Sequence, residues 1–457
     1  MINATAVCRQ WRAALLSFPQ VWRKAGGSSS ELEAYLRRSK SVPIGVNLSS
    51  PSLAALIVPH TSRLKELTVR VNDPADFDHV TEQLCDPIPT LETLTVLTLN
   101  ERLPTLTLPP GVLEGLFRHL KTLALCGISA LANSQTFPHI TELYLCTSRS
   151  PWGPTIGLLY TLGHLPGLVK AYLVFQGGWY TDVHTPGVVK LPCVEEISLV
   201  ALDFTNPKSG AISPILRFLE LPKARTVYMR SSFPSYASIA VLPTTSFRER
   251  LPNYLELQEL RIETNRGSGE IVFRSASQAS LTYYTEQLAD CERELLLWGG
   301  LPIRSIRRVT AIQLDLRSGE EDVWLVDLLG KLEFLEVLEL GGDCGHVLRR
   351  LRHRMVRGVI SIRINTLIIR GGGYGEIQAL KFESVKDVVG LGDMTVTYIP
   401  DPAVCEGFSD FGSESEGDPD LDDDEYSDEG DEDGEDEDDD EDDDEDEDGS
   451  DEDDEDE

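Results

Sequence analysis

The hexapeptide Leu120-Lys-Thr-Leu123-Ala-Leu125 decides the fold, because leucine stands at its first, fourth and sixth positions and related hexapeptides recur along the chain. Successive side chains of a strand point to opposite faces, so the last two leucines share one face and the residue between them lies on the other. Related hexapeptides begin at Leu64, Leu91, Ile140, Leu168, Val194, Ala224, Leu257, Val309 and Leu335.

These copies have a nearly regular period. Neighbouring copies begin 20 to 33 residues apart, except for one step of 52 between Leu257 and Val309, which predicts a further copy hidden between Ile271 and Leu281. Short strands of this kind bury their apolar residues only by stacking on their neighbours. The sequence therefore predicts an α/β fold, in which residues 44–402 form a curved solenoid with a parallel sheet on its inner face.

The residues between the buried positions of each strand point to the inner face, where solenoids usually bind their partners. Tyrosine and arginine are enriched among the residues that dominate binding energy. We therefore predict that a protein partner contacts Tyr144, Tyr172, Tyr228 and Arg230. Ordinary solvent-exposed strand positions are the alternative interpretation of these four residues.

The segment Ala4–Trp22, ATAVCRQWRAALLSFPQVW, precedes the repeats and has helical periodicity. Four apolar residues fall at helical spacing and predict one apolar stripe, which consists of Val7, Trp11, Ala14 and Leu15. Pro19 suits the first turn of a second, very short helix, after which Trp22 closes back toward Trp11.

A third helix is predicted after the turn that follows Trp22. Ser30 stands where an N-cap residue is expected, and Glu33 completes the spacing of a capping box. The sequence therefore predicts a short all-α module over residues 1–43.

The N-terminal stretch resembles the second half of an F-box, the helical module that docks on the Skp1 adaptor of cullin ubiquitin ligases. The residues that carry the resemblance are Val7, Cys8, Arg9, Trp11, Arg12, Pro19 and Trp22. The run Leu36–Pro43 also resembles the sequence that follows F-boxes in large fungal families. The opening helix of the family, with its Leu-Pro and acidic signature, has no counterpart between Met1 and this stretch. The resemblance implies that a Skp1-like adaptor is bound by Val7, Cys8, Trp11, Arg12, Leu15, Pro19 and Trp22.

The repeats resemble the leucine-rich repeats of F-box proteins, although the asparagine that usually follows the strand motif is mostly missing. Together the two resemblances imply a substrate-recognition adaptor of a Skp1-cullin-type ubiquitin ligase. Such an adaptor binds an as yet unidentified protein substrate on the concave face of its solenoid.

The charge distribution sets the C-terminal segment apart. Of 76 acidic residues, 35 lie in residues 410–457, whereas residues 1–409 hold 41 acidic residues and all 41 Lys and Arg. A run of one charge sign cannot bury apolar surface, so a disordered acidic tail is predicted over residues 403–457. A leucine-rich body with such a tail resembles the acidic leucine-rich nuclear phosphoproteins. The alternative function is therefore a scaffold or chaperone for basic proteins such as histones.

The sequence contains no pattern that indicates catalysis. GxSxG, HExxH and kinase motifs are absent, and the eight cysteines form no CxxC pair, so we expect no enzyme, cofactor, metal site or structural disulfide. No signal peptide and no apolar run of 18 residues occur. We therefore expect an intracellular protein, cytoplasmic or nuclear, that binds neither membrane nor nucleic acid directly.

Overall fold

The structure is a computed structural model of the 457-residue chain. It divides into two compact units, Met1–Gly407 and Phe408–Glu457. All the residues that the structure describes belong to the first unit, and they are 9–84, 87–98, 106–107, 118–130, 136–147, 154–175, 188–201, 218–231, 250–265, 268–285, 303–314, 321–342, 344–371, 381 and 393–399.

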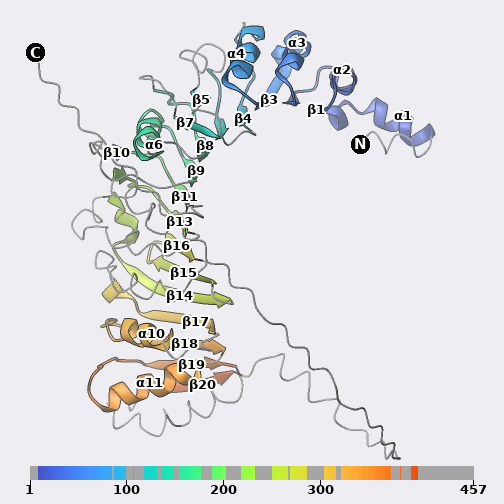
Figure 1. Cartoon of the computed structure of the whole chain (residues 1–457). Coiled ribbons are helices and arrows are strands. Elements are labelled where there is room, and N and C mark those ends of the chain that lie inside the picture. Colours follow the sequence, from blue (N-terminus) through green and yellow to red (C-terminus); the bar gives the residue numbers. More distant parts are fainter. Residues whose placement is uncertain are drawn as a thin grey trace, which may run out of the picture. The chain divides into compact units, whose positions relative to one another are not determined.

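The fold is mixed α/β and is dominated by one long sheet (Figure 1). Within the described residues this sheet has sixteen strands. In spatial order they are β1 (Lys24–Gly26), β2 (Ile44–Leu48), β3 (Leu64–Val71), β4 (Thr93–Thr98), β6 (Thr122–Cys126), β8 (Glu142–Thr147), β9 (Lys170–Phe175), β11 (Glu196–Ala201), β13 (Thr226–Ser231), β16 (Ser280–Thr285), β15 (Ser268–Ser275), β14 (Leu257–Asn265), β17 (Arg308–Leu314), β18 (Val337–Gly342), β19 (Thr366–Arg370) and β20 (Thr395–Ile399). Each of the ten hexapeptides of the sequence analysis contributes a strand to it.

Two small parallel sheets accompany the long one. They pair β5 (Leu106–Thr107) with β7 (Ile128–Ala130), and β10 (Val189–Lys190) with β12 (Leu219–Glu220). The described α-helices are α1 (Arg9–Ser17), α2 (Ser29–Arg38), α3 (Ala54–Ile57), α4 (Pro74–Gln83), α6 (Pro154–Gly163), α10 (Glu321–Leu329) and α11 (Gly345–Val356). The described 3-10 helices are η2 (Pro19–Trp22), η3 (Pro51–Leu53), η4 (Val58–Arg63), η5 (Pro252–Tyr254) and η6 (Ile303–Ser305).

Pairing in the long sheet is parallel, with one reversal at β15. This strand is antiparallel to both of its neighbours, β14 and β16, whereas β16 pairs in parallel with β13, and β14 with β17. The chain therefore skips two positions after β13, returns through β15 and β16, and skips again to β17. The predicted hidden copy exists as β16, a parallel strand that begins at Ser280 and buries Leu281. Its place in the sheet was not predicted, because β16 pairs with β13 and Ile271 lies in the reversed strand β15.

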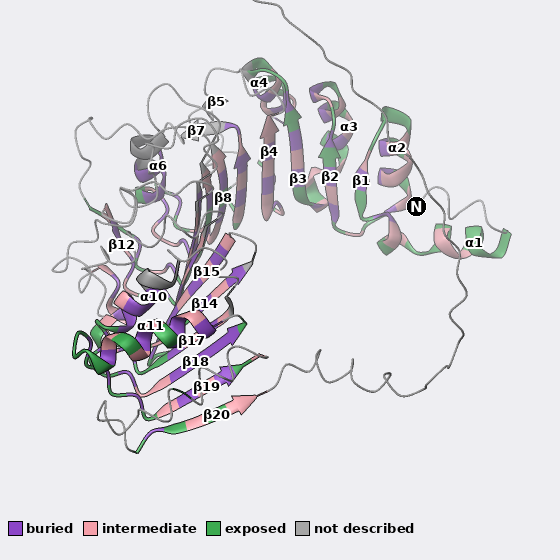
Figure 2. Ribbon diagram, turned by 60° about the horizontal axis from the view of Figure 1, so that its bottom comes forward, coloured by how far each residue is buried: buried purple, intermediate pink, exposed green. Residues whose placement is uncertain are grey.

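The strands alternate between a buried face and an open face. In β6, Leu123 and Leu125 are buried and Thr122, Ala124 and Cys126 are partly exposed. The same alternation runs from strand to strand in Figure 2. Buried residues of α10 and α11 join the strand leucines in one apolar core, which places these helices against the buried face. The face opposite this core is called the open face below.

A turn that recurs before the strands joins neighbouring repeats. The backbone N–H of the first hexapeptide residue donates to the carbonyl three residues earlier, as in Leu91 to Ile88 at 3.2 Å, Leu168 to Leu165 at 3.1 Å and Ala224 to Leu221 at 3.2 Å. The residue at each turn start is itself buried. A buried apolar residue three positions before most of the hexapeptides is therefore part of the repeat, and sequence reasoning missed it; Thr61 stands at this position before Leu64.

The N-terminal module is not all-α. Lys24–Gly26 forms β1, which pairs in parallel with β2, and the Gly45 N–H donates to the Arg23 carbonyl at 2.8 Å. Without β1, the strand β2 would leave a row of unpaired backbone groups at the sheet edge, and the three-residue strand satisfies them.

The N-cap of α2 lies two residues earlier than predicted. The backbone N–H and the hydroxyl of Ser28 both donate to the Glu31 carboxylate, at 2.9 and 3.1 Å. The hydrogen bond from the Ser28 backbone is the main cause that lowers the pKa of Glu31. Gly27, whose φ of 101° favours glycine, turns the chain into this cap.

None of the helices in the described ranges is long and apolar enough to cross a membrane.

Candidate functional site

Trp22 anchors the N-terminal hairpin of α1 and η2. Its side chain is fully buried, its ring meets Tyr35 edge-on with centroids 5.3 Å apart, and the Arg38 guanidinium lies 4.5 Å from its centroid. The indole Nε1–H donates to the Leu15 carbonyl at 2.8 Å, which ties α1 to η2. Pro19 begins η2, as the sequence predicts.

The apolar stripe predicted on α1 is not buried in the structure. Trp11 is 63% exposed, Ala14 and Leu15 are only partly buried, and α1 has no fully buried residue. The expectation that Trp22 closes on Trp11 is also replaced, because Trp22 packs on α2 instead. A helix at the edge of a sheet has a neighbour on one side only, so its periodicity does not ensure burial.

The hairpin instead presents apolar side chains to solvent. Leu16 is 39% exposed and Phe18 is 59% exposed, in addition to Trp11. These three residues are called the apolar ridge below. Arg12 is exposed beside the ridge, whereas Val7 and Cys8 lie outside the described residues.

The open face brings the predicted tyrosines together. Tyr144 and Tyr172 are register partners on β8 and β9, are 44% and 43% exposed, and have ring centroids 6.2 Å apart. Ser198 and Tyr228 continue the same row on β11 and β13. Ser198 stands between Tyr172 and Tyr228 in this row, and its buried hydroxyl has no hydrogen-bond partner among the described residues.

Arg230 follows Tyr228 by two residues on the same face of β13. It contacts Tyr284, a residue that was not among the predicted partner residues. Its guanidinium is 4.9 Å from the ring centroid of Tyr284, its register partner on β16. Burial raises the pKa of Tyr228 and outweighs the lowering effect of the Arg230 charge. The four predicted partner residues thus lie on one face, and Tyr284 extends their surface, because β16 follows β13 in space and not in sequence.

A buried carboxylate organises the open face further along the sheet. Glu339 on β18 has a side chain only 6% exposed and accepts from Arg308 at 3.0 Å and from Arg370 at 2.5 Å. Burial raises the pKa of Glu339. The hydrogen bonds and charges of Arg370 and Arg308 lower it by more than burial raises it, so the net shift is downward. The three side chains tie β17, β18 and β19 together.

This downward pKa shift gives a pH-dependent prediction. Glu339→Gln is expected to destabilise the protein by about 1–2 kcal/mol at neutral pH, since the two half-exposed arginines are partly screened by solvent. A lowered folded-state pKa contributes stability above the unfolded pKa of about 4.3, and this contribution is lost as pH falls through the folded pKa. Urea denaturation should therefore show the variant and the parent converging below about pH 4.

Glu263→Gln is the matched control, because Glu263 pairs with Arg261 at 2.7 Å on the surface of the same sheet. Its cost should stay below about 1 kcal/mol. A Glu339 variant as stable as this control would contradict the assigned role of the buried carboxylate.

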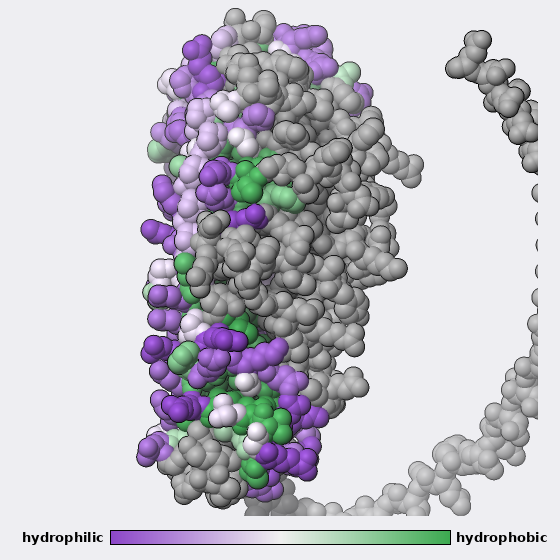
Figure 3. Space-filling model, turned by 90° about the vertical axis from the view of Figure 1, so that its left-hand side faces the viewer, coloured by the Kyte–Doolittle hydropathy of each residue, from purple (hydrophilic) through white to green (hydrophobic). Residues whose placement is uncertain are grey.

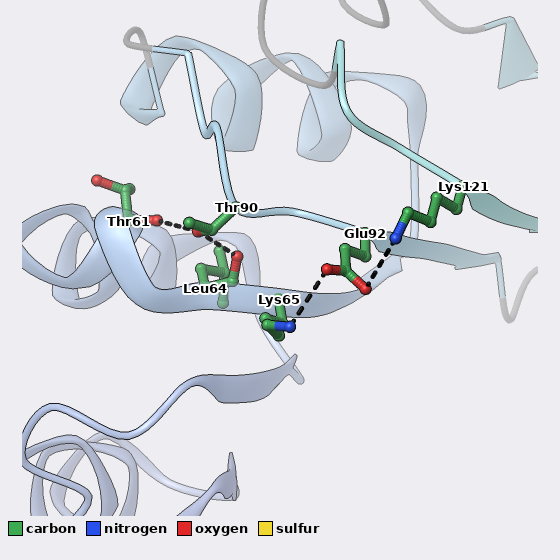
Figure 4. Close-up of polar contacts among 6 residues, drawn as sticks. All are labelled: Thr61, Leu64, Lys65, Thr90, Glu92 and Lys121. Carbon is green, nitrogen blue, oxygen red and sulfur yellow. Dashed lines mark hydrogen bonds and ion pairs between the residues drawn. The ribbon is translucent and has the colours of Figure 1, made fainter. Parts of the chain in front are cut away.

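A polar ladder runs along the edge where the strands begin. The Glu92 carboxylate accepts from Lys65 at 3.2 Å and contacts Lys121 at 3.6 Å, while the Thr90 hydroxyl donates to the Thr61 and Leu64 carbonyls (Figure 4). The hydrogen bond from Lys65 is the main cause that lowers the pKa of Glu92. These charges are exposed, so they add little stability. Their main effect is to place opposite charges next to each other on neighbouring strands.

A small cavity lies between η2 and the first strands. Its volume is about 270 Å³, and Arg23, Lys24, Ile44, Lys65 and Glu66 are among its lining residues. Ligand pockets usually measure about 300–1,000 Å³, so this cavity is below the usual size. Within the described ranges, no group of three or more His, Cys, Asp or Glu is placed to hold a metal ion.

In comparison with known proteins, the chain matches no protein-family model and no curated protein sequence.

Proposed function

We propose that the protein is a substrate-recognition adaptor of a Skp1-cullin-type ubiquitin ligase and not itself an enzyme. The observation that carries the proposal is the apolar ridge of Trp11, Leu16 and Phe18, which is exposed to solvent. The hairpin that bears the ridge is fixed to the rest of the protein by the buried side chain of Trp22. Exposed tryptophan and phenylalanine on a fixed scaffold are typical of protein-binding sites. The ridge belongs to the stretch that resembles an F-box, which makes a Skp1-like adaptor the proposed occupant.

The long sheet is proposed to be a leucine-rich-repeat-like curved solenoid. The recurring turn before the strands, the parallel pairing and the helices on the buried face support this interpretation. The substrate would then bind on the open face. Tyr144 and Tyr172 are the exposed aromatic pair there, and Tyr228, Arg230 and Tyr284 continue their surface.

The test is binding of the full chain to purified Skp1. The double variant Trp11→Ala/Phe18→Ala removes two exposed rings without touching the core, and binding should weaken by about 30-fold or more if either ring is a hot spot worth about 2 kcal/mol. The control is Val359→Ala. Val359 is 67% exposed and follows α11, and hydrophobic surface is visible where α10 and α11 lie in Figure 3.

The control should bind Skp1 as the parent does. Absence of Skp1 binding by the parent, or equal binding by the parent and the double variant, would rule out the proposed docking site. In the same design, Tyr144→Ala/Tyr172→Ala should keep Skp1 binding and lose the substrate.

The acidic run of residues 410–457 favours a second function, a scaffold for basic proteins such as histones. A tail with 35 carboxylates attracts such partners electrostatically, and salt weakens this attraction. Deletion of residues 410–457 separates the two functions. It should abolish salt-sensitive histone binding if the protein is a scaffold and leave Skp1 binding unchanged if it is an adaptor.

A further inference from the structure

Two cysteines that are 20 positions apart in the sequence face each other on the open face. Cys126 ends β6, Cys146 lies in β8, and the two are register partners in adjacent parallel strands. Both are free thiols and both are partly exposed. Adjacent strands are about 4.8 Å apart, which is within the range of about 4.4–6.8 Å between the Cα atoms of a disulfide.

The backbone beside the pair is held firmly. The Gly127 N–H donates to the Cys146 carbonyl at 2.7 Å, directly after the Cys126 position. Gly127 has a φ of 79°, and a Cβ there would lie 1.7 Å from Thr98 Cγ2, so only glycine fits. The backbone on which the two cysteines stand is therefore fixed, with Cys126 and Cys146 as register partners on β6 and β8.

The surroundings favour thiol chemistry at one of the two sulfurs. A hydrogen bond between the thiols is the main cause that lowers the pKa of Cys126 to about 7, and the same contact, together with burial, raises the pKa of Cys146. A thiolate at Cys126 with a protonated neighbour is the arrangement of an attacking and a resolving thiol.

The two strands that flank the pair are β4 and β9. Leu97 on β4 and Val174 on β9 continue its row, because they are the register partners of Cys126 and of Cys146. Tyr144 and Tyr172 lie on the same face two residues before Cys146 and Val174. Glu142 and Lys170 lie two residues before those tyrosines.

We propose that Cys126 and Cys146 form a reversible dithiol–disulfide pair that reacts with small-molecule disulfides such as glutathione disulfide. The Cys126 thiolate attacks one sulfur of the reagent, which forms a mixed disulfide and releases one thiolate. Cys146 then loses its proton and attacks the Cys126 sulfur, which releases the second thiolate. The protein loses two protons and two electrons, and the reagent becomes two thiols. This assignment does not depend on the adaptor function.

The pair lies within the surface proposed for partner binding. Cys146 follows Tyr144 by two residues on the same strand and face. The disulfide would link β6 to β8 beside the Tyr144–Tyr172 pair, so oxidation acts where a partner is proposed to bind.

The experiment treats the reduced full chain with glutathione disulfide and follows intact mass and unreduced peptide maps. The parent should lose two hydrogen atoms and yield one Cys126–Cys146 cross-linked peptide, which dithiothreitol reverses. Cys126→Ser and Cys146→Ser should each retain one glutathione at the remaining cysteine of the pair. Cys193→Ser is the matched control, since Cys193 is also partly exposed, and it should form the same cross-link as the parent.

Rates distinguish the attacking thiol from the resolving thiol. In the parent at pH 7, limiting iodoacetamide should alkylate Cys126 well before Cys146, because the hydrogen bond between the thiols lowers the pKa of Cys126 to about 7 and raises that of Cys146. Mixed disulfides at Cys126 or Cys146 without the cross-link in the parent, or a cross-link from either cysteine to a third cysteine, would overturn the proposal.

Discussion

Trp22→Ala is expected to lower the free energy of unfolding of the N-terminal module by about 3–5 kcal/mol, the usual cost of emptying a buried aromatic site. The indole is fully buried, contacts Tyr35 and Arg38, and donates to the Leu15 carbonyl. Truncation therefore removes the packing that holds η2 against α2 and leaves that carbonyl with only the longer hydrogen bond from the Phe18 backbone N–H, at 3.4 Å. Chemical denaturation followed by circular dichroism measures the change.

Two variants make this test specific. Trp22→Phe keeps a ring and loses the Nε1 hydrogen bond, so its cost should be intermediate. Trp11→Ala should stay within about 0.5 kcal/mol of the parent, because Trp11 is largely exposed. Equal effects of Trp11→Ala and Trp22→Ala would mean that the two tryptophans do not differ in burial as described.

Tyr254→Ala is the second large effect, with an expected cost of about 3–5 kcal/mol. Tyr254 ends η5, is fully buried, and donates its hydroxyl to the Ser280 carbonyl at 3.0 Å. It thereby fastens the turn before β14 to the first residue of β16. Burial raises the pKa of Tyr254, so its hydroxyl stays protonated and remains a donor at neutral pH.

Tyr254→Phe separates the ring from the hydroxyl. The ring still fills its site, so only the hydrogen bond is lost, at a cost of about 1–2 kcal/mol. Hydrogen exchange of the β15 and β16 amides should accelerate in both variants. Unchanged exchange in Tyr254→Ala would show that other contacts hold β15 and β16 in the sheet.

The strands were predictable because their signal is local. In Leu120-Lys-Thr-Leu-Ala-Leu125 the alternation of apolar residues determines the buried face, whatever the neighbouring strand is. Exposure of Tyr144 and Tyr172 follows from the same alternation. Tyr284 was missed because its neighbour Arg230 is brought to it by strand order, which no local pattern encodes.

The N-terminal module shows where local patterns fail. Trp11 and Trp22 are both tryptophans in helical segments, but only Trp22 has Tyr35 and Arg38 against it. The cap of α2 was misplaced because serines occupy positions 28–30 and glutamates follow three residues after two of them. The turn at Gly27 selects Ser28, and that backbone angle is not visible in the sequence.

The reversal at β15 was also missed, although the sequence holds a signal for it. Asn265 and Ser268 are paired across β14 and β15 with only Arg266 and Gly267 between them, the length of a two-residue hairpin loop. A glycine at that spacing favours an antiparallel return over a parallel crossover, which needs a dozen residues or more.

We expect the same reversal to affect the order in which the strands pair during folding. Where strands follow one another in space and in sequence, each completed strand is a template for the next, and ordering spreads from neighbour to neighbour. At β13 that progression stops, because its partner β16 begins only about 50 residues later, after β14 and β15. We therefore expect that during synthesis the edge of β13 stays unpaired until β16 has been made. We expect the refolding rate to depend on formation of the β13–β16 pair more than on any other strand pair.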